Sequence, residues 1–307
     1  MSPSPAAVEH QQQRAVISAA TARAAVRLWQ QTDPDDLQRS WRLLLPRVVA
    51  LVTAGQLGAA RQSQPYLDEL LRGVDSEGRI RPEALAGVAA DGRDLLELLL
   101  YPLWVTLSGI SRGVSTAASI ASGAAFLDLL ARTLVADMGR AADLVGMIVR
   151  PAVTSYVRVV EMPACARCIL LAGVEYGLST GFQRHPRCDC GMEPVTRTHR
   201  PEPTSAKTMF GQLSPARQLT TFGAAAVKAI EAGADIAQVV NARRGMSTAT
   251  AYGRAVQATT EGMTRRGIAG ARRRGARSPR LMPEEIFRLA SDREQAVRML
   301  RQHAYIV

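Results

Sequence analysis

The sequence predicts a mainly α-helical protein, with a helical N-terminal region, a small central β element stapled by zinc, and a helical C-terminal region. Apolar residues recur at helical spacing in both terminal regions. The composition agrees, because 47% of the residues are hydrophobic and only 5% are aromatic, which is typical of helices packed through small side chains. The exception is a β-branched run at Tyr156–Val160, which leads directly into four clustered cysteines.

Residues 1–150 form the predicted N-terminal helical domain. A first helix is expected over residues 6–31, and Thr32–Asp35 should end it and start the next. That second helix should be kinked or split at Pro46. Its apolar positions at helical spacing are Leu43, Leu44, Val48, Leu51 and Val52. A further helix is expected to begin at Pro82, because proline is favoured in a first helical turn.

The same region contains all three tryptophans and a run of small residues. Trp29, Trp41 and Trp104 lie among the apolar positions, so they are predicted to anchor the core. Small residues dominate positions 109–125 and allow helices to approach closely. Ordinary packing within one chain is the favoured interpretation of this run. The alternative is a seam between copies of the chain, which would make the protein a homo-oligomer.

Residues 151–195 are predicted to form a β/loop element with short strands over 156–160 and 174–176. A linker rich in proline and threonine is expected over 196–213, and a helical C-terminal region over 214–307. The helices expected in that last region cover residues 215–223, 224–232, 234–243 and 283–303.

The four cysteines and one histidine of the central element have the spacing of a metal site. Cys165-x-x-Cys168 brings two thiolates to one metal, and His185, Cys188 and Cys190 supply three further donors. Five donors for the four positions of a tetrahedral shell leave no obvious open position, which favours structural Zn²⁺ over catalytic zinc. Which four donors bind is left open by the spacing. Disulfides, uncoordinated thiols and an iron–sulfur or redox role are the alternatives.

The order of residues around these donors resembles a known family. A strand, Cys-x-x-Cys, a Leu-Ala-Gly turn, an aromatic at position 176 and then His-Pro-x-Cys-x-Cys are similar to the signature of the phage Mu F-like minor head proteins of tailed bacteriophages. The stretch from Gly181 to Cys190 resembles the version found in actinobacteriophages. The resemblance is closest over residues 150–195 and looser over the rest of the chain.

This resemblance implies a structural minor capsid protein. Such a protein would associate with the portal, the major capsid protein or both, and would lie inside the phage head of the virion after assembly in the host cytoplasm. Many relatives are labelled capsid maturation proteases, so that activity is the first alternative function. A zinc-dependent DNA-binding protein with a regulatory role is the second.

The sequence offers little support for a protease. His185 belongs to the metal cluster, and His10, His199 and His303 are interpreted as solvated surface residues. No Gly-x-Ser-x-Gly nucleophile motif accompanies His199 or His303, and the His-Glu-x-x-His motif of metalloproteases is absent from the sequence. The sequence therefore predicts no catalytic residues.

Positive charge is concentrated in one segment of the C-terminal region. The net charge of the chain is +11, and residues 242–280 contain ten arginines against the single acidic residue Glu261. Such a tract predicts contact with the phosphates of packaged double-stranded DNA without sequence preference, or with acidic surfaces of partner proteins. The arginines proposed to contact DNA are Arg243, Arg244, Arg265, Arg266, Arg272, Arg273, Arg274, Arg277 and Arg280.

The sequence predicts no secretory or membrane segment. The most apolar stretch, residues 95–110, is interrupted by Glu97 and Pro102 and is too short to span a bilayer.

Overall fold

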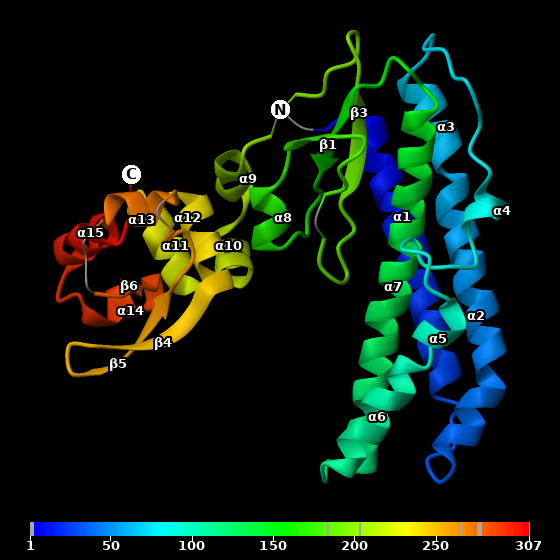
Figure 1. Cartoon of the computed structure of the whole chain (residues 1–307), viewed down its shortest axis with the longest axis horizontal. Coiled ribbons are helices and arrows are strands. Elements are labelled where there is room, and N and C mark those ends of the chain that lie inside the picture. The colour runs from blue at the N-terminus through cyan, green and yellow to red at the C-terminus, as the bar shows by residue number, and fades with distance from the viewer. Residues whose placement is uncertain (1–2, 183, 203, 265, 275–277, 307) are drawn as a thin grey trace. The chain divides into compact units, whose positions relative to one another are not determined.

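The structure is a computed structural model that describes residues 3–182, 184–202, 204–264, 266–274 and 278–306 (Figure 1). The chain forms two compact units. The first unit comprises Met1–Glu161 and Gly173–Pro203, and the second comprises Met162–Ala172 and Thr204–Val307. Helices predominate in both terminal regions and small sheets occur between and within them, which confirms the predicted fold class.

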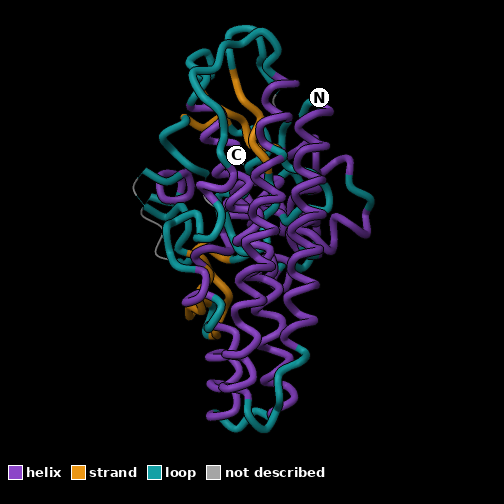
Figure 2. The backbone as a smooth tube through the Cα atoms, turned by 90° about the vertical axis from the view of Figure 1, so that its right-hand side faces the viewer, coloured by secondary structure: helices purple, strands orange, loops and turns teal. Residues whose placement is uncertain are grey.

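Four long helices build most of the first unit: α1 (Pro5–Trp29), α2 (Leu37–Arg61), α6 (Tyr101–Ser111) and α7 (Thr116–Ile148). Helix α7 packs against the other three, and Figure 2 shows long helices running side by side. Side-chain caps begin three of these helices, because Ser4, Asp36 and Ser115 each accept a hydrogen bond from a backbone N–H of the first turn. Shorter helices complete this part of the unit: α3 (Ser63–Leu70), α4 (Pro82–Leu85) and α5 (Leu95–Leu98).

Two of the three tryptophans anchor the core of this unit. Trp29 and Trp41 are fully buried, meet edge to face, and donate their indole N–H groups to backbone carbonyls. Trp104 does not share this role, because half of its surface is exposed. Its position on α6 is apolar in sequence, but the side chain lies on the outer face of the helix. The expected core role is therefore wrong for Trp104.

Helix α2 runs through Pro46 without being split. Proline removes one backbone donor, so the carbonyl four residues earlier, that of Arg42, loses its helical partner. Both residues lie on the exposed side of the helix, where water can satisfy that carbonyl. Apolar spacing is also an incomplete guide here, since Val48 and Val52 are fully buried whereas Leu43 is largely exposed.

A three-stranded antiparallel sheet follows α7 in the first unit, with the order β2-β1-β3. Strand β1 (Ser155–Val159) is central and fully buried, and it confirms the strand predicted there. It pairs with β2 (Glu175–Gly177) on one side and with β3 (Gly191–Val195) on the other. The sheet thereby fixes both ends of the segment that contains the cysteines.

The second unit is a set of short helices with a second small sheet. Most helices expected here occur: α10 (Pro215–Phe222), α11 (Ala224–Glu231) and α12 (Ile236–Ala242). The helix expected over 283–303 is interrupted, and forms α14 (Pro283–Leu289) and α15 (Arg293–Gln302). The unit also contains α8 (Ala166–Leu170), α9 (Ala206–Gln212) and α13 (Ile268–Arg272). Helix α9 lies inside the segment expected to be a linker.

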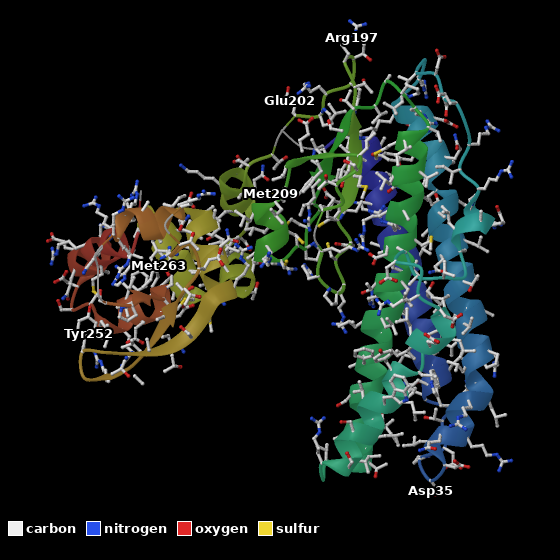
Figure 3. All side chains as sticks on the ribbon, in the orientation of Figure 1. Asp35, Arg197, Glu202, Met209, Tyr252 and Met263 are labelled. Atoms are coloured by element: carbon white, nitrogen blue, oxygen red, sulfur yellow. The ribbon has the colours of Figure 1, made fainter. Side chains whose placement is uncertain are left out.

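The arginine-rich segment is not simply helix or loop. After a 3-10 turn over Arg243–Gly245, it forms an antiparallel hairpin of β4 (Met246–Ala251) and β5 (Arg254–Thr259), and β6 (Arg280–Leu281) adds a third strand. Tyr252, labelled in Figure 3, and Gly253 make the two-residue turn with positive φ at both positions, as a type I′ hairpin requires.

Two helical stretches, Leu37–Leu70 and Thr116–Ile148, are long and apolar enough to cross a membrane by length and composition. The expectation of no membrane segment overlooked both, because it rested on the stretch over 95–110. Core helices pass the same test, and both stretches contribute residues to the buried core of the first unit. The finding is therefore weak evidence for a membrane span.

Candidate metal centre

The first pair of predicted ligands lies at the start of α8. Cys165 is the N-cap of this helix, and its sulfur accepts a hydrogen bond from the backbone N–H of Cys168 at 3.4 Å. Cys168 is buried, whereas Cys165 is exposed. A Cys-x-x-Cys turn of this kind points both sulfurs to the same side of the first helical turn.

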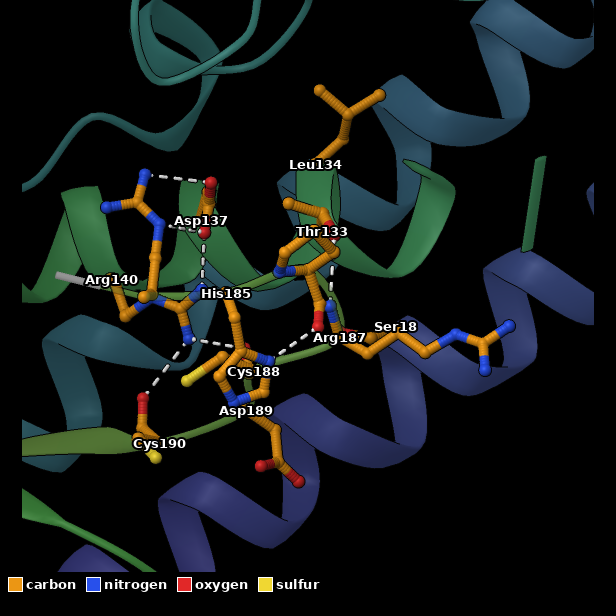
Figure 4. A network of polar contacts seen from close by, with 12 residues as sticks. Ser18, Thr133, Leu134, Asp137, Arg140, His185, Arg187, Cys188, Asp189 and Cys190 are labelled. Carbon is orange, nitrogen blue, oxygen red and sulfur yellow. Dashed lines mark hydrogen bonds and ion pairs between the residues drawn. The ribbon is translucent and has the colours of Figure 1, made fainter. Parts of the chain in front are cut away.

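The second group of ligands lies in the loop that enters β3. Cys188 and Cys190 are almost fully buried, and His185 is partly exposed. Arg140 of α7 donates hydrogen bonds to the carbonyl oxygens of Cys188 and Cys190 at 3.0 and 3.1 Å (Figure 4). Arg14 of α1 donates to the carbonyl oxygens of Asp189 and Cys190 at 3.3 and 3.2 Å. Two buried arginines of the helical bundle therefore hold the backbone of this loop.

The five predicted donors come together as two overlapping groups. Cys165, Cys168 and His185 form one group, and Cys168, Cys188 and Cys190 form the other. Within each group all candidate ligand atoms lie within 4.8 Å of one another, and Cys168 belongs to both groups. The cluster can bind a metal ion, as the spacing predicted.

A third buried arginine lies against the sulfurs themselves. Arg158 of β1 is 2% exposed, and its Nη2 lies 3.4 Å from the sulfur of Cys188 and 3.5 Å from that of Cys190. The guanidinium also stacks over the ring of Phe182, 4.4 Å from its centre. A cationic donor at this distance stabilises negative charge on sulfur, and the thiolate is the form of cysteine that binds metals.

The arginines that hold the loop are themselves neutralised by buried or half-buried acids. Arg14 pairs with Asp143 at 2.8 Å, and both side chains are fully buried. Burial opposes ionisation of Asp143, but contacts with His10 and Arg14 outweigh it and lower the pKa of this carboxyl. Arg140 pairs with Asp137, and burial lowers the pKa of Arg140.

His10 belongs to the same network and is not the solvated residue expected from its polar neighbours. It is 4% exposed, its Nε2 lies 2.7 Å from Asp143, and its ring stacks on Tyr66 at 4.1 Å. The sequence did not reveal His10 and Arg14 as partners in this network, because Asp143 lies more than 120 positions away from both. The one available signal was the spacing of four between His10 and Arg14, which places both on one face of α1.

Two further histidines make specific contacts within the fold. His199 is held by Glu193, with 3.1 Å between Nε2 and the carboxylate, and that carboxylate is buried. His303 is fully buried, and its Nδ1 accepts hydrogen bonds from Arg273 and from the backbone N–H of Leu281. Burial, followed by the charges of Arg273 and Arg280, lowers the pKa of His303 to about 3. The interpretation as a solvated surface residue is therefore wrong for His303, whereas His199 stays partly exposed, with 26% of its side chain accessible.

The arginine tract divides into inward and outward members. Arg273 and Arg280 are buried, and both donate to carbonyl oxygens near the C-terminal end of the chain. Arg280 also lies 4.3 Å from the centre of the Tyr305 ring. A guanidinium enclosed in this way cannot reach a phosphate, so the proposed DNA contact is wrong for Arg273 and Arg280.

The remaining members of the predicted DNA-contact set are on the surface where the structure describes them. Arg243 and Arg244 are exposed and pair with Glu284 and Glu261. Three further arginines are also exposed: Arg266, Arg272 and Arg274. Two other members, Arg265 and Arg277, lie outside the described residues.

No protein-family model, curated protein or solved structure matches this chain.

Proposed function

We propose that the chain is a structural minor capsid protein of a tailed bacteriophage. In this proposal it lies inside the head with the portal or the major capsid protein, and its cysteine cluster holds one structural Zn²⁺. The exposed arginines of residues 242–280 contact packaged DNA without sequence preference. The supporting observation is that the five residues of the phage-like signature lie together as one candidate metal cluster.

Zinc is the metal that this donor set suits best. Cys168, Cys188 and Cys190 are buried and provide three soft sulfur ligands. Cys165 or His185 supplies the fourth, since each lies close to Cys168. Tetrahedral coordination by thiolates, with or without one imidazole, is typical of structural zinc. Binding would add folding free energy to a loop that has few apolar side chains of its own.

Measurement of the metal content of the purified chain tests the proposal that the cysteine cluster holds zinc. Protein prepared without chelator should contain about one zinc per chain. Cys168→Ser should lose the metal, because this residue belongs to both donor groups. Ala172→Ser is the matched control, since it adds a hydroxyl at a buried position near α8 and removes no sulfur. Wild-type protein without metal, or zinc retained in Cys168→Ser, would contradict the proposal.

Separate substitutions identify the fourth ligand. Cys165→Ser and His185→Ala should differ, with one losing high-affinity zinc and the other keeping it, because four ligands complete the shell. Competition against a chromogenic zinc chelator measures the affinity. Equal retention of zinc in both variants would mean that each residue can replace the other, or that neither completes the shell.

Assembly in a head tests the function itself. When the chain is co-expressed with the portal and major capsid proteins of the same phage genome, it should purify with the particles at low copy. If particles assemble but the purified particles lack this chain, the structural proposal is overturned. Cleavage of the capsid protein only when this chain is present would favour the protease alternative.

A further inference from the structure

Arg158 on β1 contacts two sulfurs of the loop that enters β3 through a single nitrogen. Its Nη2 donates to the sulfurs of Cys188 and Cys190 at 3.4 and 3.5 Å. This nitrogen has two N–H groups at a fixed angle in the plane of the guanidinium, so one N–H group can serve each sulfur. The contact therefore fixes the two sulfurs relative to each other as well as to the sheet.

The guanidinium of Arg158 is itself held in place at both ends of the residue. The backbone N–H of Arg158 donates to the carbonyl oxygen of Val174 at 3.0 Å, and its carbonyl oxygen accepts from the N–H of Gly173 at 2.9 Å. At the other end, the guanidinium stacks on Phe182, which is 3% exposed. Because backbone and side chain are both fixed, the positive charge stays beside the sulfurs.

The buried groups of the candidate centre carry charges that cancel when zinc is bound. Cys168, Cys188 and Cys190 are at most 4% exposed, and cysteines bind metals as thiolates. Three thiolates and one Zn²⁺ sum to one negative charge, and the guanidinium of Arg158 adds one positive charge. Net charge is costly inside a protein, because burial removes it from water. A fourth thiolate would restore the negative charge, whereas a neutral imidazole would not.

His185 is oriented to bind a metal as a neutral ligand. Its Nδ1 lies 2.8 Å from the carbonyl oxygen of Pro186. A carbonyl oxygen can only accept a hydrogen bond, so Nδ1 carries the proton and the lone pair of the neutral ring lies on Nε2. Metal-binding histidines are commonly held in one tautomer by a carbonyl or carboxylate in this way.

Two arginines that flank His185 attach its loop to α7. Arg184 pairs with Asp137 at 2.6 Å, and Arg187 pairs with Asp128 at 3.1 Å. Figure 4 shows the loop of His185 beside this helix. The imidazole is therefore held near the cluster by contacts that do not involve a metal.

Cys165 has a role that does not require the metal. Its sulfur caps α8 by accepting a hydrogen bond from the N–H of Cys168, and its side chain is exposed. Serine is among the preferred residues at such a cap. Cys165→Ser should therefore preserve the cap and remove only the sulfur.

We infer that Arg158 is a positioning residue that sets the metal centre to three thiolates and one imidazole, with His185 as the fourth ligand. The inference rests on the proposed zinc centre and refines it. Arg158 acts through the sulfurs of Cys188 and Cys190, because a guanidinium has no lone pair to offer a metal.

Cobalt binding to the full chain tests the ligand set. Co²⁺ bound to cysteine gives a thiolate-to-cobalt charge-transfer band, whose intensity rises with the number of bound thiolates. Cys165→Ser should keep the wild-type intensity. His185→Ala should bind cobalt more weakly and recover when imidazole is added, because imidazole supplies the missing nitrogen. Loss of intensity in Cys165→Ser would establish a fourth thiolate and overturn the inference.

Arg158→Met tests the positioning role in the same spectra. Without the N–H···S hydrogen bonds, the sulfurs hold their electrons less tightly, so the band should move to lower energy. Zinc affinity should fall about 10- to 100-fold, as for other residues that orient metal ligands. Arg140→Met is the matched control, because it removes a buried arginine that contacts the carbonyl oxygens of the same loop. Its band should stay in place.

Arg158→Lys keeps the positive charge and provides a second variant if the methionine variant folds poorly. It should recover part of the zinc affinity, because the ammonium supplies the charge but not the planar fork of donors. Equal zinc affinity in the two variants, or an unchanged band and affinity in Arg158→Met, would overturn the inference and leave the zinc centre standing. A wild-type chain that binds neither zinc nor cobalt would overturn the zinc centre and this inference with it.

Discussion

At the scale of single residues, His303 shows how burial fixes a protonation state. Its Nδ1 accepts two hydrogen bonds, from Arg273 and from the backbone of Leu281, so the ring is held in the neutral form. The pKa of about 3 in the folded chain lies below the ordinary value of 6.5. The unfolded chain therefore binds a proton that the folded chain does not bind between these two pH values. Stability should fall as pH decreases through this window.

We expect His303→Asn to weaken this acid sensitivity. The asparagine Oδ1 can accept the same hydrogen bonds but does not titrate. In the wild type this group contributes a slope of up to about 1.4 kcal/mol per pH unit to the free energy of unfolding. Urea denaturation at several pH values between 7 and 4 measures the slope for both proteins. Parallel pH profiles would show that His303 does not carry the effect.

The Arg14–Asp143 pair provides a second prediction at this scale. Asp143→Asn should lower the free energy of unfolding by about 3–5 kcal/mol, because it leaves a fully buried guanidinium without its counter-charge. Glu83→Gln is the control, since it breaks the exposed pair with Arg61 and should cost about 0–1 kcal/mol. Denaturant titration monitored by helical circular dichroism compares the two. Equal effects would contradict a structural role for the buried pair.

Residue-scale contacts were the hardest part to predict from sequence. The cysteine and histidine donors were found because their spacing is local and chemically distinctive. Arg14, Asp143 and Arg158 were missed because each acts on a partner that is distant in sequence. Arg273 and Arg280 were misinterpreted for the related reason that composition counts charges and does not show which side chains turn inward. Burial decides that question, and burial depends on the tertiary fold.

At the scale of elements, the contact between α6 and α7 depends on glycine. A Cβ atom at Gly123 would lie 2.2 Å from Oγ1 of Thr106 and 2.6 Å from the ring of Trp29. Gly123→Ala should therefore destabilise the first unit by about 1–3 kcal/mol through overpacking. Gly211 in α9 is the control, because a Cβ there meets no described atom within 4 Å. Thermal unfolding should show a lower midpoint for Gly123→Ala.

Gly211→Ala should change the free energy of unfolding in the opposite direction to Gly123→Ala. Alanine is favoured over glycine inside a helix by about 1 kcal/mol, and no contact opposes the change at this position. A small rise in the free energy of unfolding is expected. Destabilisation by both alanines to the same extent would show that loss of glycine, and not the contact with Thr106 and Trp29, causes the effect.

Sequence patterns predicted those elements that are specified locally. The break at Thr32–Asp35 and the helix starts expected at residues 215 and 224 are confirmed by the structure. The β4–β5 hairpin was missed because its arginines drew attention to charge, and its turn uses Tyr252 at positive φ where asparagine or glycine is usual. The interrupted C-terminal helix was likewise missed, because Ser291 and Asp292 start a new helix inside an apparently continuous pattern.

At the scale of the whole molecule, the uneven charge distribution provides a test of the DNA contact. Alanine at Arg266, Arg272 and Arg274 removes three exposed charges without disturbing the buried Arg273 and Arg280. The slope of log affinity for duplex DNA against log salt should become shallower by up to about 3. Fluorescence anisotropy at several salt concentrations measures this slope. Binding should weaken alike for unrelated sequences.

A matched triple variant separates local contact from net charge. Alanine at Arg39, Arg42 and Arg47 removes the same charge from exposed positions of α2 and should leave the slope nearly unchanged. Equal effects of the two triple variants, or no DNA binding at low salt, would argue against an arginine contact with DNA. Selective binding of one sequence would favour a regulatory DNA-binding protein.

The most direct test of the central claim is a density map of heads assembled with this chain and its portal and capsid proteins. The claim predicts density for the helical bundle at low copy on the inner side of the shell near the portal. The same particles should contain zinc in proportion to this chain. Complete heads that show neither the chain nor its zinc would contradict the account.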